Sequence, residues 1–287
     1  MTSCFFVSDL HGKADRYRKL FDAIIEERPQ VVFLGGDLLP HPVESVQALS
    51  TTGGDFLHDC LQSGFEKVRD RLGERYPSVF LILGNDDPRS AESSILEGQK
   101  NGLWQYIQNR AVTYGDFTIT GYACVPPTPF LGKDWERYDV SRYVDPGCVP
   151  PEEGIFSGDI TRHELIYSTM QDDLARLGGG MDFNRSVFLF HSPPYNTKLD
   201  RADLDGKMVD HVLLDPHIGS IAVRRFIEEC QPYVTMHGHV HESCRLTGGW
   251  RERFGRTASF SAAHDGPELA LVRFILENPD SVSRELL

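Results

Sequence analysis

Short apolar runs, each followed at once by a Gly, Ser, Asp, Asn or His residue, recur along the chain. Clear runs occupy residues 4–7, 31–34, 79–83 and 187–190, and a less apolar run occupies residues 233–236. Uninterrupted apolar runs that end in turn residues are typical of strands buried on both faces. The segments between them, such as 14–27, 56–72 and 219–229, have helical character. This alternation predicts an α/β fold built from βαβ units.

Two further strands and a long insertion are predicted outside this alternation. Residues 117–122 and 268–276 have strand-like runs, and we expect them to pair antiparallel in a second sheet. Residues 125–158, between them, are rich in Pro, Gly and aromatic residues without periodicity, which is typical of a functional loop. We expect this loop-rich insertion to cover the active site, with residues 133–138 at its tip. No repeat or linker divides the sequence, which predicts a single domain over residues 1–287.

Polar side chains of metal-binding type follow each of the five strand-like runs. In open α/β sheets, ligands gather at the carboxyl ends of strands, so these side chains are expected to meet in space. Carboxylate and imidazole groups are ligands for divalent Mn, Fe and Zn, and a pair of such ions needs a bridging carboxylate. The candidate ligands are Asp9, His11, Asp37, Asn85, His191, His237 and His239.

Each of these short motifs also has an ordinary structural explanation. Asp9-x-His11 is compatible with a surface turn, and Gly36-Asp37 with a helix N-cap or a phosphate-binding turn. The Gly84-Asn85 motif is common in turns, and His237-Gly-His239 is compatible with a structural pair. Because all of them occur in order, each directly after a predicted strand, the sequence favours a metal centre over separate turns.

The ordered motifs resemble those of the calcineurin-like metallophosphoesterase family. They are Asp9-x-His11, Gly36-Asp37, Gly84-Asn85, His191 and Gly-His239, and they span most of the chain. The resemblance implies a four-layer α/β/β/α sandwich of two mixed β-sheets with flanking helices. It also implies two metal ions bridged by Asp37. In this scheme Asp9, His11 and His239 complete the first ion's ligands, and Asn85, His191 and His237 complete the second's.

The residue after Asn85 departs from the family pattern. Family members commonly carry His there, which contacts a phosphate oxygen or protonates the leaving group, whereas this chain has Asp86. We therefore predict Asp86, Asn85 and His191 as catalytic residues. His241 and Arg89 are predicted to bind substrate, His241 also being a candidate acid and Arg89 a partner for phosphate oxygens.

The predicted reaction is the hydrolysis of phosphate esters, with phosphodiesters preferred, by a hydroxide that bridges two divalent ions. A phosphomonoesterase or pyrophosphatase acting on a small phosphorylated metabolite is the alternative enzyme. A weakened metal-binding interaction scaffold is the alternative outside catalysis. The sequence contains no Gly-x-Ser-x-Gly nucleophile motif, no Gly-x-x-x-x-Gly-Lys phosphate loop and no Gly-x-Gly-x-x-Gly fingerprint, which argues against other hydrolases and nucleotide-binding proteins.

Composition narrows the partners and the compartment. The net charge of −13 disfavours long nucleic acids, so a small phosphorylated substrate is expected, and a homo-oligomer is compatible with the sequence. The apolar run at residues 4–7 is too short for a secretory signal or a membrane span, so no membrane association is expected. Six scattered cysteines without a Cys-x-x-Cys pair predict reduced thiols in the cytoplasm. The resemblance implies Mn²⁺ or an Fe and Zn mixture, and the ligand types admit Ni²⁺ as well.

Overall fold

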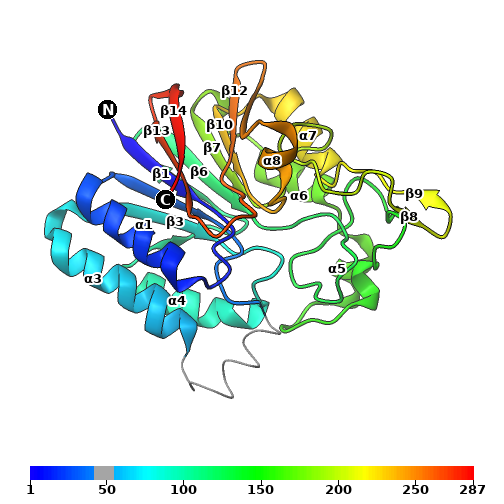
Figure 1. Ribbon diagram of the computed structural model, residues 1–287, viewed down its shortest axis with the longest axis horizontal. Coiled ribbons are helices and arrows are strands. Elements are labelled where there is room, and N and C mark those ends of the chain that lie inside the picture. Colours follow the sequence, from blue (N-terminus) through cyan, green and yellow to red (C-terminus); the bar gives the residue numbers. More distant parts are fainter. Residues whose placement is uncertain (42–54) are drawn as a thin grey trace.

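The computed structural model of the chain describes residues 1–41 and 55–287. Two six-stranded mixed sheets pack face to face, with helices on both outer sides, as Figure 1 shows. This arrangement confirms the predicted four-layer sandwich. Among the described residues, no helix is both long enough and apolar enough to cross a membrane.

The first sheet has the strand order β14-β13-β1-β2-β3-β4. Its strands β1 to β4 run parallel, and β13 and β14 are antiparallel to their neighbours. The bounds are β1 (Ser3–Val7), β2 (Val31–Gly35), β3 (Ser78–Ile82), β4 (Gln105–Tyr106), β13 (Ala270–Ile275) and β14 (Asn278–Leu286).

The second sheet has the order β11-β12-β10-β7-β6-β5. Its four central strands are parallel, and the two edge strands are antiparallel. The bounds are β5 (Ala111–Tyr114), β6 (Phe117–Tyr122), β7 (Ser186–Phe190), β10 (Val234–His237), β11 (Arg251–Phe254) and β12 (Thr257–Ser261). A separate hairpin joins β8 (Met208–Val209) to β9 (Val212–Leu213).

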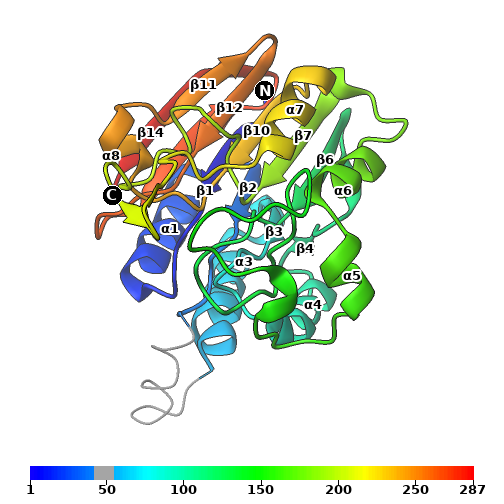
Figure 2. The ribbon, with the colours of Figure 1, turned by 90° about the vertical axis from the view of Figure 1, so that its right-hand side faces the viewer.

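Helices cover the outer face of each sheet (Figures 1 and 2). The first sheet is covered by α1 (Ala14–Glu27), α3 (Ser63–Leu72) and α4 (Glu92–Lys100), and the second by α6 (Met170–Leu177) and α7 (Ile221–Cys230). Shorter helices are α5 (Arg162–Tyr167) and α8 (Ser243–Thr247), and a π-helical segment η1 (Leu57–Gln62) runs directly into α3. Single 3-10 turns are η2 (Gly73–Arg75), η3 (Arg89–Ala91), η4 (Pro151–Glu153) and η5 (Phe183–Arg185).

The apolar runs form strands because both of their faces are covered. All five residues of β2 are buried, and Phe33 of β2 stacks between Phe80 of β3 and Phe274 of β13. On the other side, Phe188 and Phe190 of β7 pack against Phe226 of α7. The core therefore fixes the direction of the central strands, and with it the edge at which their carboxyl ends meet.

The predicted pairing of residues 117–122 with 268–276 is wrong. Strand β6 lies parallel to β7 in the second sheet, whereas β13 lies antiparallel to β1 in the first. Both segments are strands, as predicted, but an apolar run shows only that a strand is buried. Its partner is decided by packing between segments that are distant in the sequence.

Residues 125–158 form the loop-rich insertion, and isolated β-bridges with the single turn η4 are its regular structure. The predicted tip, residues 133–138, is instead the buried part of the insertion. Lys133 is completely buried, and Trp135 and Tyr138 are each 2% exposed, whereas Phe130 and Leu131 are 63% and 56% exposed. Burial follows from the ion pair of Lys133 with Glu136 and from the ring contacts of Trp135.

Candidate metal centre

The carboxyl ends of five parallel strands bring the candidate residues together. The turn after β1 is held against the turn after β2, because the amide of Asp9 donates to the Gly36 carbonyl (3.0 Å) and the amide of His11 to the Asp37 carbonyl (2.8 Å). In the second sheet, the amide of Gly238 after β10 donates to the carbonyl of His191 after β7 (2.9 Å). The predicted convergence of loops that are far apart in sequence is thus present.

Four of the candidate side chains sit on backbone in the left-handed region. The φ angles are 57° at Asp9, 47° at His11, 51° at Asp37 and 72° at His239. This region is uncommon for residues other than Gly, and it costs free energy that the surrounding structure must offset. Such conformations concentrate at functional sites, and here they turn the chain sharply as it leaves each strand.

Two glycines permit the close approach of these turns. A Cβ atom on Gly84 would lie 2.3 Å from Asp37 Oδ1, and one on Gly238 would lie 2.1 Å from Ser8 Oγ and 2.7 Å from Asp9 Oδ2. These distances are too short for any side chain. Glycine therefore precedes Asn85 because the Asp37 carboxylate occupies the space of a Cβ, and it precedes His239 because the Ser8 hydroxyl and the Asp9 carboxylate do.

A first group of possible metal ligands contains Asp9, His11, Asp37 and His241. His241 Nε2 lies 3.0 Å from His11 Nε2 and 3.2 Å from Asp9 Oδ1, and His11 Nε2 lies 3.8 Å from Asp37 Oδ2. Asp9 Oδ2 is buried and has no hydrogen-bond partner among the described residues. Since an orphaned carboxylate oxygen is costly in the interior, its position fits a cation ligand.

A second group contains Asp37, His191 and His239. His191 Nε2 lies 3.2 Å from Asp37 Oδ2 and 3.0 Å from Asn85 Oδ1, so Asn85 belongs to this group as well. Asp37 is the member that the two groups share. The structure thus brings Asp37 to the place that a bridging carboxylate would take.

Asp86 lies beside both groups. Its amide donates to Asp37 Oδ1 (2.9 Å), its Oδ1 accepts from Asn85 Nδ2 (2.9 Å), and its Oδ2 is 3.7 Å from His11 Nδ1. The three predicted catalytic residues, Asp86, Asn85 and His191, therefore form one continuous row.

The electrostatics of the centre are those of buried carboxylates held by imidazoles. Burial opposes ionisation of Asp37, but His191 and His11 outweigh it and hold the pKa of Asp37 well below its usual range. Burial likewise opposes charge on His191, and Asp37 raises the pKa of His191 to about 10. Burial, followed by Asp37, raises the pKa of Asp86 to about 6. The centre favours a positive charge next to Asp37, which a divalent cation would supply on displacing the His191 proton.

The structure places His237 outside both groups, contrary to the sequence expectation. Its Nδ1 donates to the Ser192 carbonyl (3.0 Å), which can only accept, so its Nε2 is the acceptor for the Thr235 hydroxyl (2.9 Å). Both ring nitrogens are therefore engaged, and burial lowers the pKa of His237 to about 4. His241, expected to bind substrate, lies in the first group of possible ligands, and His239 lies in the second.

The sequence contains a signal for this difference. In the other turns of both sheets, the candidate ligands come after the strand has ended. Asp37, for example, follows Gly36, and Asn85 follows Gly84. His237 precedes Gly238 and is the last residue of β10, whereas His239 and His241 follow that glycine. The spacing Gly-His-x-His identifies the two residues that reach the centre.

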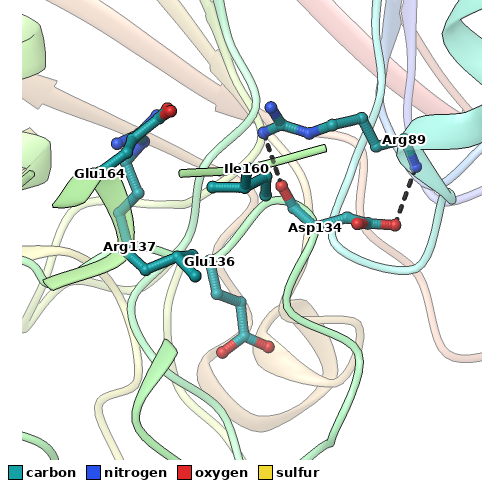
Figure 3. Close-up of a pocket in the computed structure, with 7 residues that line it drawn as sticks. Arg89, Asp134, Glu136, Arg137, Ile160 and Glu164 are labelled. Carbon is teal, nitrogen blue, oxygen red and sulfur yellow. Dashed lines mark hydrogen bonds and ion pairs between the residues drawn. The ribbon is translucent and has the colours of Figure 1, made fainter. Parts of the chain in front are cut away.

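Arg89 is also placed differently from the expectation. Its guanidinium donates to the Asp134 carbonyl (2.8 Å) and lies 4.5 Å from the centre of the Trp135 ring. Figure 3 shows Arg89 at a pocket between the insertion and the segment that leads into α5, with Ile160 between Arg89 and the pair Arg137 and Glu164. Arg89 thus binds the insertion. Asp134 and Trp135 are residues near the centre that the sequence reasoning did not single out.

The donor set fits divalent cations of the Mn, Fe and Zn type. It offers carboxylate and amide oxygens together with imidazole nitrogens, and the ligand atoms within each group lie within 4.8 Å of one another. The orphaned Asp9 oxygen and the shared position of Asp37 add to this fit. The residues present can accordingly hold two ions with Asp37 between them.

Comparison with known proteins agrees with this fold. A solved structure 16% identical in sequence superposes with a TM-score of 0.59 over 99% of this chain and 98% of its own. The protein TT1561 of Thermus thermophilus is 12% identical, with a TM-score of 0.56 over 99% of this chain and 98% of its own. A dimetal phosphatase from Danio rerio is 14% identical, with a TM-score of 0.51 over 95% and 91% of the two chains. At these identities the likeness concerns the fold.

The family of the chain is shown by comparison of its sequence with known protein families. No curated protein matches the chain. The family described as calcineurin-like phosphoesterase matches residues 3–243, which include every candidate ligand. This match confirms the resemblance drawn from the motifs, and the chain belongs to the calcineurin-like phosphoesterase family, whose members are metal-dependent hydrolases of phosphoric esters.

Proposed function

We propose that the chain hydrolyses small phosphodiesters with two divalent cations, Mn²⁺ foremost. The observation that carries this proposal is Asp86, a carboxylate beside Asn85 at the position where relatives commonly have an imidazole. The proposed location is the cytoplasm, which is supported by the six cysteine thiols, all within the described part of the chain and none in a disulfide.

The proposed ligands follow the two groups. Asp9, His11, Asp37 and His241 would hold one ion, and Asp37, Asn85, His191 and His239 the other. When bound, such a pair of ions supplies activation of water near neutral pH and stabilisation of charge on the phosphoryl oxygens.

The side chains of the centre supply orientation. Asp37 presents one carboxylate to both groups, and its Oδ1 is fixed by the Asp86 amide. Asn85 presents its Oδ1 toward His191 while its Nδ2 donates to Asp86. Asp86 thus sets the orientation of the Asn85 amide, and it presents negative charge at the same edge of the centre.

This charge is the reason for the preference for diesters. A phosphomonoester is close to a dianion at neutral pH, whereas a diester carries one negative charge. A carboxylate ~4 Å from an anionic oxygen adds a repulsion of ~4 kcal/mol at an effective dielectric constant near 20. The repulsion grows with the charge of the substrate, so it penalises the monoester more. Burial and Asp37 raise the pKa of Asp86 to about 6, which lies below neutral pH, and bound divalent cations would lower it, so the carboxylate form prevails.

The test compares bis-p-nitrophenyl phosphate with p-nitrophenyl phosphate as substrates of the Mn²⁺-loaded protein. We expect kcat/KM to favour the diester in the natural protein, and Asp86→His to reduce that ratio by about tenfold or more, which corresponds to about 1.4 kcal/mol. A natural protein that prefers the monoester supports the phosphomonoesterase alternative. Tight binding of two Mn²⁺ ions without turnover of either substrate supports the scaffold alternative.

A further inference from the structure

We infer that Asp134 and Trp135 of the insertion are positioning residues for the loop of residues 84–90, which carries Asn85 and Asp86. We call these two residues the clamp. The inference deepens the proposed function and rests on it where it concerns metal ions. According to this inference, the buried part of the insertion supports the loop that carries the candidate metal ligand Asn85.

The clamp holds the loop through its backbone. Trp135 Nε1 donates to the carbonyl of Asp87 (2.8 Å), and the carboxylate of Asp134 accepts from the amide of Arg89 (2.9 Å). The Arg89 guanidinium donates back to the Asp134 carbonyl, as the dashed lines in Figure 3 show. Arg89 also lies over the Trp135 ring. The clamp therefore binds the end of the loop through two backbone groups, the Asp87 carbonyl and the Arg89 amide, and through the Arg89 side chain.

Ser157, at the far end of the insertion, contacts both the loop and the clamp. Its hydroxyl accepts from the Ser90 amide (3.0 Å) and donates to Asp134 Oδ2 (2.5 Å), and its amide donates to Asp134 Oδ1 (2.9 Å). The Asp134 carboxylate thus joins Arg89 and Ser157, and Asp134 is 8% exposed. Two distant parts of the insertion converge on one carboxylate beside the loop.

Asp87 connects the clamp to the candidate ligands. While its carbonyl accepts from Trp135, its buried carboxylate accepts from the amides of Leu38 (3.0 Å), Leu39 (2.7 Å) and Gly84 (2.9 Å). Leu38 and Leu39 are the two residues after Asp37, and Gly84 directly precedes Asn85. The position of Asp87 accordingly determines how the turns bearing Asp37 and Asn85 lie relative to each other.

The clamp is supported by a buried hydrogen-bond network of the insertion, which we call the base. Lys133 Nζ contacts Glu136 Oε2 (2.5 Å) and donates to the Thr128 carbonyl (2.8 Å), and Glu136 accepts from the amide and hydroxyl of Thr128 (2.7 and 2.6 Å). Every one of these groups is buried. A closed, buried network of this kind holds one arrangement. The base therefore supports the loop, while the exposed Phe130 and Leu131 lie at the solvent side of the insertion.

The first measurement is a Mn²⁺ titration by calorimetry of the natural protein and of Trp135→Phe, which keeps an aromatic ring and removes the Nε1–H. We expect one of two Mn²⁺ affinities to fall about tenfold, at the lower end of the effect of outer-shell partners, with the other within about twofold. Asp134→Asn should act on the same ion. The matched control is Tyr138→Phe, an equally buried ring of the insertion whose hydroxyl donates to Glu152 and not to the loop.

The second measurement is hydrogen exchange of residues 84–90 in the metal-free proteins. We expect faster exchange in Trp135→Phe and Asp134→Asn, and natural protection in Tyr138→Phe. Unchanged exchange in both clamp variants overturns the inference, as does faster exchange with unchanged Mn²⁺ affinities or an equal effect in Tyr138→Phe. A natural protein that binds no Mn²⁺ refutes the proposed function, and in that case exchange alone decides whether the clamp positions the loop.

Discussion

The two sheets contribute chemically different halves to the candidate metal centre. The turns of the first sheet supply the carboxylates Asp9 and Asp37 and the amide of Asn85, with His11 beside them. The turns of the second sheet supply imidazoles alone, from His191, His239 and His241. The carboxylates thus come from one half and most of the imidazoles from the other, so both candidate ligand groups are complete only when the halves meet.

The halves are also held in different ways. In the first, backbone amides around the Asp87 carboxylate fix the turns, and Asp9, His11 and Asp37 all have left-handed backbone. In the second, a chain of side-chain hydrogen bonds runs from Ser259 through Thr235 and His237 to the Ser192 carbonyl. His237 thus supports the second half as Asp87 supports the first, each next to the candidate ligands.

The largest effect is expected from Asp37, where the halves join. Asp37→Ala removes the carboxylate that both groups share, so it should abolish phosphodiester hydrolysis and most metal binding. Asp9→Asn removes a charge from one group alone and should retain one ion. Metal analysis after gel filtration measures both. Two tightly bound ions in Asp37→Ala would contradict the bridging position.

A smaller effect is expected from the second half, where substitutions of His241 and His237 should have different consequences. His241→Ala should lower the affinity of one Mn²⁺ ion by more than about 100-fold, beyond the effect of outer-shell partners. His237→Phe keeps the stacking on Phe190, removes the ring N–H that donates to the buried Ser192 carbonyl, and leaves the Thr235 hydroxyl with Ser259 alone. It should leave two ions bound and lower the free energy of unfolding by about 2 kcal/mol. The reverse pattern in metal titration and urea unfolding would restore His237 as the ligand.

The smallest effect is expected from Thr235, which tests whether the hydrogen-bond chain stabilises the second half. Thr235→Val keeps the shape of the side chain and removes the hydroxyl between His237 and Ser259, which should lower the free energy of unfolding by about 1 kcal/mol. The matched control is Thr257→Val, because Thr257 is equally buried and its hydroxyl has no partner among the described residues. Equal losses in the two variants would show that the chain contributes nothing specific.

The sequence predicted the strands and turns that depend on local pattern. Residues 14–27 form α1 as expected, and the turns after β1, β2, β3 and β7 bring Asp9, Asp37, Asn85 and His191 together. Helix α7 begins at Ile221, later than expected, because Ser220 caps it and Asp139 accepts from its first amides. Local composition indicates a helix well and its first residue less well.

Features that depend on distant contacts were beyond the sequence. Three histidines at alternate positions, 237, 239 and 241, would share a face if the strand continued. Strand β10 ends at His237 and the backbone at His239 is left-handed, so the alternation stops; Gly238 marks the end of the strand, but the sequence does not reveal the left-handed turn after it. The clamp was hidden for a similar reason, since Asp134 and Trp135 lie in an insertion without periodicity and gain their role from contacts with residues about 45 positions earlier.

The pairing of His11 with His241 across 230 residues has a consequence for the biosynthesis of the protein. Translation proceeds from the N-terminus, so the carboxylate half emerges from the ribosome long before the imidazole half. Asp37 gains His191 only after β7 has been made, and Asp9 gains His241 only after β10 and the turn that follows it. The candidate centre is therefore completed late, and a chain stalled before Gly238 would hold Asp9 and Asp37 without the full set of imidazoles.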